Sequence, residues 1–170
     1  MADTVYDEFM DEDTQKGKYM SFRLGNEYYG IGINYVNEII GIQPITEVPK
    51  TEDYIRGLIN LRGKIIPVID VRIRFGKEPV PYNDRTCIIV IEVNRFVVGV
   101  IVDTIADVVT IEDQNIVPPP KVGKHSKENK YIYGIGKIGE DVKLLIDPEM
   151  LLDEEDIEEL MEKETQTEEE

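Results

Sequence analysis

Positions 29–42 read YGIGINYVNEIIGI, and the chain repeats this pattern 69 positions later. The second version is VGVIVDTIADVVTI, at positions 98–111, so that Gly30 matches Gly99. Each version is followed by a Val-Pro pair. An internal repeat is sought before any other pattern, because missing it leads to the wrong architecture. The repeat predicts two similar units packed together.

A second repeat follows the first, at a spacing of 77 positions. Residues 54–70 read YIRGLINLRGKIIPVID, and residues 131–147 read YIYGIGKIGEDVKLLID. A unit of about 50 residues would bury only roughly 60% of its chain surface and would be marginally stable alone. We therefore expect the two units to share an apolar wall and to form one cooperative body with two lobes.

The net charge of −16 comes almost entirely from the ends of the chain. Residues 1–18 hold six acids and residues 149–170 hold twelve, so the middle of the chain is nearly neutral. Phosphate-binding surfaces need clustered basic residues, so we expect no nucleic-acid partner and no binding to anionic membranes. We also expect no signal peptide and no membrane insertion, because the apolar runs are far shorter than the roughly 20 residues that span a bilayer. With one cysteine and no internal disulfide, a cytoplasmic protein is predicted.

Short Ile- and Val-rich segments separated by Gly, Pro and Asn turns predict small β-barrels. The expected fold is all-β with minor helix: two SH3-like five-stranded β-barrel lobes packed together, with a C-terminal acidic helix. Short helical turns are expected at 36–39, at 51–56 and at 71–75. The predicted boundaries are a disordered acidic lead (1–17), a double-barrel domain (18–155), lobe 1 (about 26–82), lobe 2 (about 83–147 plus the first strand), a helix (149–163) and a disordered acidic tail (164–170).

Residues that carry chemistry are few. The only histidine, His125, lies in a polar loop among lysines and is interpreted as an exposed loop residue. One histidine cannot form a two-histidine metal site. Cys87 lies in an apolar segment and is interpreted as a small buried residue, because no neighbour in the sequence would lower its pKa.

Two patterns leave alternatives open. The stretch GIGKIG at 134–139 matches G-x-G-x-x-G, but the dinucleotide fingerprint needs a helix directly after the glycines, and an acidic pair and a strand follow here. Glu38 and Asp107 occupy equivalent positions, so they either form an acid/base pair between the lobes or are solvated charges at strand edges. No nucleophile with a base is found, and we expect no enzyme activity, no cofactor and no metal.

The two repeats differ most at the tip of the second hairpin. The first tip reads NLRGK at 60–64 and is basic, whereas the second reads KIGED at 137–141 and is acidic. Arg62-Gly63 is either only a tight turn, in which Gly supplies a positive φ, or also an anchor for carboxylates and helix carbonyls. We predict a binding role for Arg62.

These residues also carry a family resemblance. NLRG at 60–63, followed by IIPVIDVR at 65–72, resembles the signature of the bacterial chemotaxis coupling protein CheW. Similar flanking stretches are YGIGI at 29–33 with Val36 and Glu38-Ile39, FVVGVIVD at 96–103 and YIYGIG at 131–136. The likeness covers about residues 18–155. It implies a non-enzymatic scaffold of two SH3-like barrels that couples chemoreceptors to the histidine kinase CheA.

The resemblance also implies contact residues. Chemoreceptor tips, which are helical hairpins, are expected in the groove between the lobes, and the matching positions are Val36, Glu38, Arg62 and Val108. The repeat pattern adds Ile33, Val102 and Ile105 to this receptor-binding set. The regulatory domain of CheA is expected to contact the end of the first lobe at Ile42, Pro44, Gly57 and Leu58. A second kinase contact, which closes rings in the family, is put in doubt here because the chain has Val117-Pro118-Pro119-Pro120-Lys121-Val122 at that place.

The expected function is therefore transmission of sensory signals within receptor arrays. The protein is expected to be a monomer in isolation and to be recruited to the inner face of the membrane through receptors. Two alternative functions remain. One is a generic SH3-like peptide binder, although this chain has no tryptophan with which to line an aromatic groove. The other is a nucleotide-binding regulator that uses residues 134–139.

Overall fold

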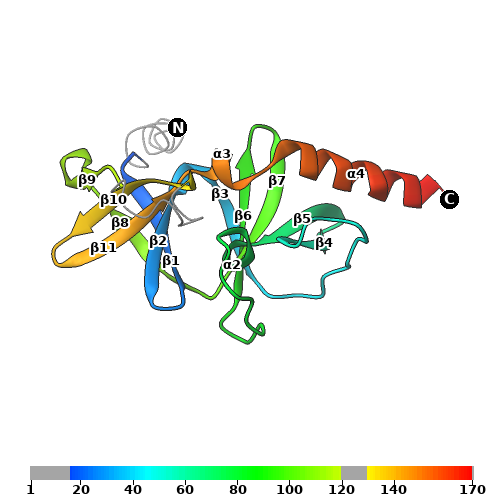
Figure 1. The fold of residues 1–170 in the computed structure, drawn as a ribbon, viewed down its shortest axis with the longest axis horizontal. Helices are drawn as coiled ribbons and strands as arrows, with labels where there is room; N and C mark the ends of the chain where they lie inside the picture. Colours follow the sequence, from blue (N-terminus) through cyan, green and yellow to red (C-terminus); the bar gives the residue numbers. More distant parts are fainter. Residues whose placement is uncertain (1–15, 120–129, 170) are drawn as a thin grey trace, which may run out of the picture.

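Two β-sheets form the body of the protein in the computed structural model, which describes residues 16–119 and 130–169 (Figure 1). In chain order the elements are β1 (Lys18–Leu24), β2 (Glu27–Gly32), η2 (Ile33–Tyr35), β3 (Val36–Gly41), β4 (Ile55–Leu61), β5 (Lys64–Asp70), α2 (Val71–Arg74), β6 (Cys87–Val93), β7 (Phe96–Val102), β8 (Thr104–Thr110), η3 (Asp113–Asn115), β9 (Ile116–Val117), β10 (Ile132–Ile138), β11 (Asp141–Ile146), α3 (Pro148–Leu151) and α4 (Glu154–Glu169).

The sheets correspond to the two expected lobes. One sheet has the strand order β8-β1-β2-β11-β10-β9 and the other β3-β6-β7-β5-β4, and we call them the six-stranded and the five-stranded lobe. Figure 1 shows the six-stranded lobe on the left and the five-stranded lobe to its right. The prediction of an all-β protein with two SH3-like lobes is confirmed. The sixth strand of the first lobe is β9, which is only two residues long.

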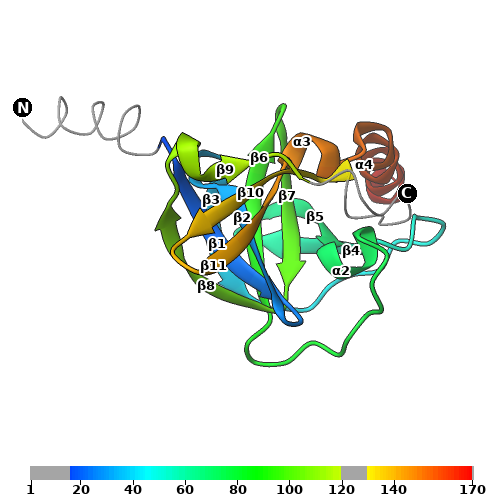
Figure 2. The same cartoon turned by 60° about the vertical axis from the view of Figure 1, so that its left-hand side comes forward.

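Each sequence repeat divides between the two lobes. Hairpin β1–β2 of the first repeat pairs with β8 and β11 of the second, as Figure 2 shows for β2 beside β11. Hairpin β6–β7 of the second repeat pairs in the same way with β3 and β5 of the first. The strands therefore do not divide at the predicted lobe bounds of about 26–82 and about 83–147 plus the first strand. The chain crosses between sheets inside the repeated stretch, directly after β2 and after β7, so repeat boundaries are not lobe boundaries.

Equivalent positions in the repeats make equivalent backbone contacts. The amide of Asp70 donates to the carbonyl of Tyr54, and the amide of Asp147 donates to that of Tyr131, both at 2.8 Å. The hairpins β4–β5 and β10–β11 also have register shifts at matching places, between Ile55 and Gly57 and between residues 132 and 134. The two repeats thus fold in the same way although they share few side chains.

Each lobe closes through the chain that follows its edge strand. After β3, the backbone of Thr46 exchanges two hydrogen bonds of 2.8 Å with Leu58 of β4. After β8, the short strand β9 pairs with Ile135 and Gly136 of β10. Closure of this kind covers part of the sheet edges, and covered edges are less able to pair with another chain.

The helices differ from the sequence expectations in three places. The segment 51–56 has no helix, because β4 already begins at Ile55 and pairs with β5. The helical turn expected at 36–39 is found directly before that segment, as a 3₁₀ turn at Ile33–Tyr35, and Val36–Gly41 is the strand β3. The single helix expected over 149–163 is split into α3 and α4, and α4 continues to Glu169, through most of the expected disordered tail. The disordered lead expected for 1–17 lies outside the described residues except at Lys16 and Gly17.

One apolar core joins both lobes. It contains buried residues from both sheets and from α4, including Phe22, Val100 and Leu160. A row of rings, Phe22–Tyr29–Phe75–Tyr131, crosses from β1 and β2 to the end of α2 and the start of β10, with centroids 5.2–5.8 Å apart. A smaller cluster around Ile59, Ile66 and Ile88 belongs to the five-stranded lobe alone. The shared core confirms the expectation of an apolar wall between the units.

Candidate functional site

The tip of hairpin β4–β5 holds an arginine in a defined position. Arg62 and Gly63 are the two residues between β4 and β5, and both have positive φ (53° and 84°), the pattern of a type I′ turn. The Asn60 side chain accepts a hydrogen bond of 2.8 Å from the Gly63 amide and so fixes the turn. The Arg62 guanidinium donates to the Glu38 carboxylate on β3. This pair is the centre of the candidate site.

The Arg62–Glu38 pair is open to solvent. The side chains are 69% and 32% exposed, so the attraction between them is screened by water and salt. The hydrogen bond from Arg62 lowers the pKa of Glu38 below its ordinary value, and the same bond raises the pKa of Arg62. Both groups are therefore charged at neutral pH, and the exposed guanidinium keeps donors available for a partner.

The other lobe has no such pair. The repeat places Gly139 opposite Arg62 and Asp107 opposite Glu38. At this tip only Gly139, the first turn residue, has a positive φ (59°), which is the pattern of a type II′ turn rather than type I′. The two tips therefore differ in backbone conformation and in charge, as expected. Of these two hairpins, only β4–β5 of the five-stranded lobe carries an arginine at its tip.

Most residues of the predicted receptor-binding set lie on partly exposed edges of the shared core. Ile33, Val36 and Ile105 are half-buried and pack against that core. Val108 lies on β8, pairs with Met20 and is 51% exposed. Val102 is 1% exposed inside the core, so the expectation that it contacts a receptor is contradicted by its burial.

The predicted kinase-binding residues lie together at the closure of the five-stranded lobe. Ile42 is half-buried against the smaller core cluster, and Pro44 is exposed. Gly57 and Leu58 are buried in β4, beneath the segment that contains Pro44. A Cβ on Gly57, whose φ is +142°, would collide with the Thr46 carbonyl. Gly57 and Leu58 therefore lie below the surface, and of these four predicted residues Ile42 and Pro44 are the ones accessible to solvent.

The structure also decides the open alternatives. Glu38 lies in the five-stranded sheet with Arg62 as its partner, whereas Asp107 is exposed on β8 of the other sheet, so they do not form an acid/base pair. The glycines at 134–139 lie in β10 and its turn, and β11 follows, so no helix N-terminus is available for a pyrophosphate. Cys87 is half-buried at the start of β6. His125 lies outside the described residues.

A contact between the lobes was missed by the sequence analysis. Arg72 of α2 donates to both Asp103 oxygens, at 2.7 and 2.5 Å, and Asp103 also accepts from the Gly25 amide at 2.8 Å. Burial raises the pKa of Asp103, but the bonds from Arg72 and Gly25 outweigh burial, and the net pKa is lowered. Asp103 begins the crossing from β7 to β8, so this cluster ties the lobes together. The sequence contained one signal for this contact. In the repeat, Arg72 corresponds to Glu149 and Asp103 corresponds to Asn34, so a pair of opposite charges occurs at only one of the two equivalent places.

Over residues 16–119 and 130–169, no group of three or more His, Cys, Asp or Glu side chains is arranged to hold a metal ion. None of the helices described is both long enough and apolar enough to cross a membrane.

Comparison with known proteins gives a consistent result. The model of the CheW-like domain family matches residues 18–156. The chain is 38% identical over 145 residues to the chemotaxis protein CheW of Klebsiella aerogenes, covering 85% of this chain and 87% of the relative. It is 36% identical to the chemotaxis protein CheW of Bacillus subtilis, covering 81% and 88%. The crystal structure of the scaffolding protein TtCheW from Thermoanaerobacter tengcongensis superposes with a TM-score of 0.71 at 37% identity, covering 77% of this chain and 88% of that one.

Proposed function

The chain belongs to the CheW-like family, and from this premise we propose that it is a chemotaxis adaptor that couples chemoreceptors to the histidine kinase CheA. The two-lobed scaffold fold supports this proposal, as do the names of the relatives. The adaptor catalyses no reaction. It acts in the cytoplasm and is recruited to the inner face of the membrane by the receptors.

The observation that carries the proposal is the exposed guanidinium of Arg62, fixed beside Glu38 at a rigid turn. A receptor tip is a helical hairpin, and helices bind through an apolar face with charged groups at the rim. Ile33, Val36 and Ile105 supply partly exposed apolar surface, and Arg62 with Glu38 supplies the charged rim. Val108 extends the surface on the other lobe, whereas Val102 supports it from inside the core.

The kinase-binding surface is the closure of the five-stranded lobe. Ile42 and Pro44 are accessible there, and they would meet the regulatory domain of CheA. Gly57 and Leu58 set the position of that segment through the Thr46 bridge. The second kinase contact, expected after β8, includes residues 117–119, and its remaining residues lie outside the described part of the chain.

Coupling requires that both surfaces belong to one rigid body. The shared core and the Arg72–Asp103 pair hold the lobes together, so a shift of the receptor moves the kinase-binding surface as well. Such a shift biases the kinase between two states without any covalent step. Each contact can be only micromolar, about −8 kcal/mol, because an array gains its strength from multivalency.

The decisive experiment reconstitutes the protein with CheA and a receptor cytoplasmic fragment and measures kinase activity and copurification. We expect Arg62→Ala to lose receptor-dependent kinase activation while the fold and the binding to CheA are kept. The matched control is Lys64→Ala, which removes a neighbouring exposed cation from the same hairpin and should leave activation unchanged.

Full activation by Arg62→Ala would show that the receptor anchor is assigned wrongly. A wild-type chain that copurifies with neither CheA nor receptor would overturn the proposed function itself. A Pro44→Asp variant separates the two surfaces, because it should weaken binding to CheA and leave binding to the receptor intact.

A further inference from the structure

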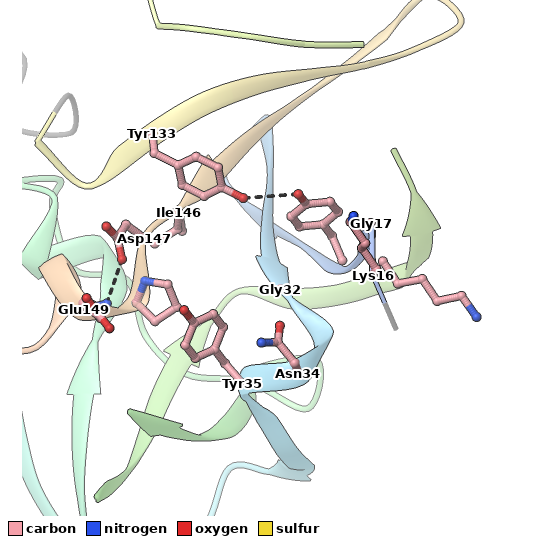
Figure 3. A pocket seen from close by; sticks show the side chains of 12 residues that line it. Lys16, Gly17, Gly32, Asn34, Tyr35, Tyr133, Ile146, Asp147 and Glu149 are labelled. Atoms are coloured by element: carbon pink, nitrogen blue, oxygen red, sulfur yellow. Dashed lines mark hydrogen bonds between the residues drawn. The ribbon is translucent and has the colours of Figure 1, made fainter. Parts of the chain in front are cut away.

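A groove of about 610 Å³ opens at one face of the junction between the lobes (Figure 3). Its walls come from the start of β1, from η2, from β10 and from the start of α3. The residues that line it are Lys16, Gly17, Lys18, Tyr19, Gly32, Asn34, Tyr35, Tyr133, Ile146, Asp147, Pro148 and Glu149. None of the predicted contact residues is among them. The groove is therefore a surface that the proposed adaptor function does not use.

The groove has aromatic walls and one acidic end. Tyr133 donates to the hydroxyl of Tyr19 across one wall, at 3.2 Å, and Tyr35 stands opposite (Figure 3). Asp147 and Glu149 lie at the acidic end. Burial raises the pKa of the Tyr35 hydroxyl most, and the negative charges of Glu149 and Asp147 raise it further. Lys16 and Lys18 line the other end, and Figure 3 shows the Lys16 side chain directed away from the carboxylates.

The repeat shows what this groove lacks. At the equivalent position on the other face of the junction, the guanidinium of Arg72 closes the gap against Asp103. Here Glu149 replaces that arginine and Asn34 replaces that aspartate. The guanidinium donor is therefore gone, and the Glu149 carboxylate and the amide oxygen of Asn34 remain as acceptors. Within the described part of the chain, no hydrogen bond or ion pair engages the Glu149 carboxylate or the Asn34 side chain.

The chain already binds a guanidinium between tyrosines elsewhere. The Arg74 guanidinium lies over the rings of Tyr54 and Tyr131, with its carbon 4.1 and 5.2 Å from the ring centroids. Its Nε donates to the carbonyl of Leu151 at 2.9 Å. Tyrosine faces attract such cations through the ring quadrupole, and a nearby acceptor fixes their orientation.

We propose that the groove is a binding site for an arginine side chain of a partner protein. The guanidinium lies between Tyr35 and Tyr133 and donates to Asp147 and Glu149, as Arg72 does to Asp103 on the opposite face. An anionic group is excluded from this end because two carboxylates face it. The site goes beyond the proposed adaptor function and does not depend on it.

The test is a titration of the ¹⁵N-labelled full-length protein with N-acetyl-arginine-methylamide, followed by NMR. We expect saturable shifts of the Asn34, Tyr35 and Glu149 amides at millimolar concentrations, as suits so small a ligand. The citrulline analogue has nearly the same shape without charge and should give no saturable shift. Free L-arginine should bind no more tightly than the capped form. Tighter binding of the free amino acid by about tenfold, or about 1.4 kcal/mol, would overturn the assignment to a protein-borne arginine.

Variants at exposed positions sharpen the test. Glu149→Gln should weaken binding by about fivefold, in the range of a partly exposed charge contact. Asn34→Asp introduces the carboxylate that Asp103 has at the equivalent position, and it should tighten binding by about threefold. Glu140→Gln, an exposed acid at the far turn of the β10–β11 hairpin, is the matched control and should change nothing. Unchanged affinity in both groove variants, with intact spectra, would overturn the proposal.

Discussion

The two lobes share one backbone plan and differ in what they present at the same places. In both lobes, the segment that follows an edge strand pairs with the hairpin at the other side of the barrel. In both hairpins, the pairing register shifts next to a glycine, Gly57 in one lobe and Gly134 in the other. The five-stranded lobe carries Arg62 at its hairpin tip, whereas the six-stranded lobe carries Gly139. Repetition has thus preserved the hydrogen-bonded framework, while the side chains at the hairpin tips have diverged.

Gly57 and Gly134 give the largest test of this comparison. Gly57→Ala should reduce the free energy of unfolding by about 3 kcal/mol, because the new Cβ collides with the Thr46 backbone at a positive φ. Gly134→Ala should cost less, about 1 kcal/mol, because its φ is not positive and its Cβ meets a side-chain methyl group of Ile116 at 2.8 Å rather than backbone atoms. Urea denaturation of both variants measures the difference. Equal losses would mean that closure by β9 is as rigid as closure through Thr46.

The two faces of the lobe junction give the next test. Asp103→Asn should reduce the free energy of unfolding by about 2 kcal/mol at pH 7, because Arg72 loses its charged partner in a partly buried site. The lowered pKa of Asp103 means that its contribution is present above the unfolded pKa of about 3.9 and is lost as pH falls through the lower folded value. Denaturation between pH 7 and pH 3 should therefore show a weaker acid dependence in the variant. An unchanged acid profile would contradict this tie between the lobes.

The paired tyrosines at the starts of β4 and β10 should respond unequally. The Tyr54 hydroxyl donates to Asp156 of α4 at 2.6 Å, and burial first, then this bond, raise its pKa. Tyr54→Phe should cost about 1 kcal/mol, the value of one hydrogen bond to a charged group at a partly exposed site. Tyr131→Phe should have a smaller effect, because no hydrogen bond of its hydroxyl is found within the described residues. Thermal unfolding, followed by circular dichroism, measures both changes.

The hairpin tip should give the smallest change in stability and the clearest change in function. Arg62→Gly makes the first tip resemble the second at this position, and glycine accepts the positive φ without strain. We expect a melting temperature within about 1 °C of the wild type, since exposed pairs contribute little. Receptor coupling should nevertheless be lost. A large drop in melting temperature would show that Arg62 supports the barrel rather than a partner.

Periodic apolar segments and turn residues were sufficient to predict the strands and the two lobes. The hairpin around Arg62-Gly63 was predicted because its flanking segments are short, Ile-rich and separated by a turn dipeptide. The division between lobes could not be predicted, because a repeat in the sequence does not reveal whether its hairpins pair within or between repeats. The helix expected at 51–56 failed because pairing of β4 with β5 outweighs a local helix-start signal.

The candidate site was predicted only in part. Arg62 was named because charge differs between the two tips, and Glu38 was named because it matches the family resemblance. The structure brings the two side chains together. Val102 was added from periodicity alone, which cannot distinguish a core edge from a core interior. The Arg72–Asp103 contact depends on a crossing between sheets, so only the three-dimensional arrangement reveals it.

The exchange of hairpins has a consequence for synthesis on the ribosome. The N-terminal hairpin β1–β2 leaves the exit tunnel first, yet its sheet neighbours β8 and β11 are among the last strands to be made. The five-stranded lobe, complete once residue 102 has emerged, can assemble while the N-terminal hairpin still waits. Nascent chains should therefore pass through a half-built stage in which the waiting strands need protection from aggregation.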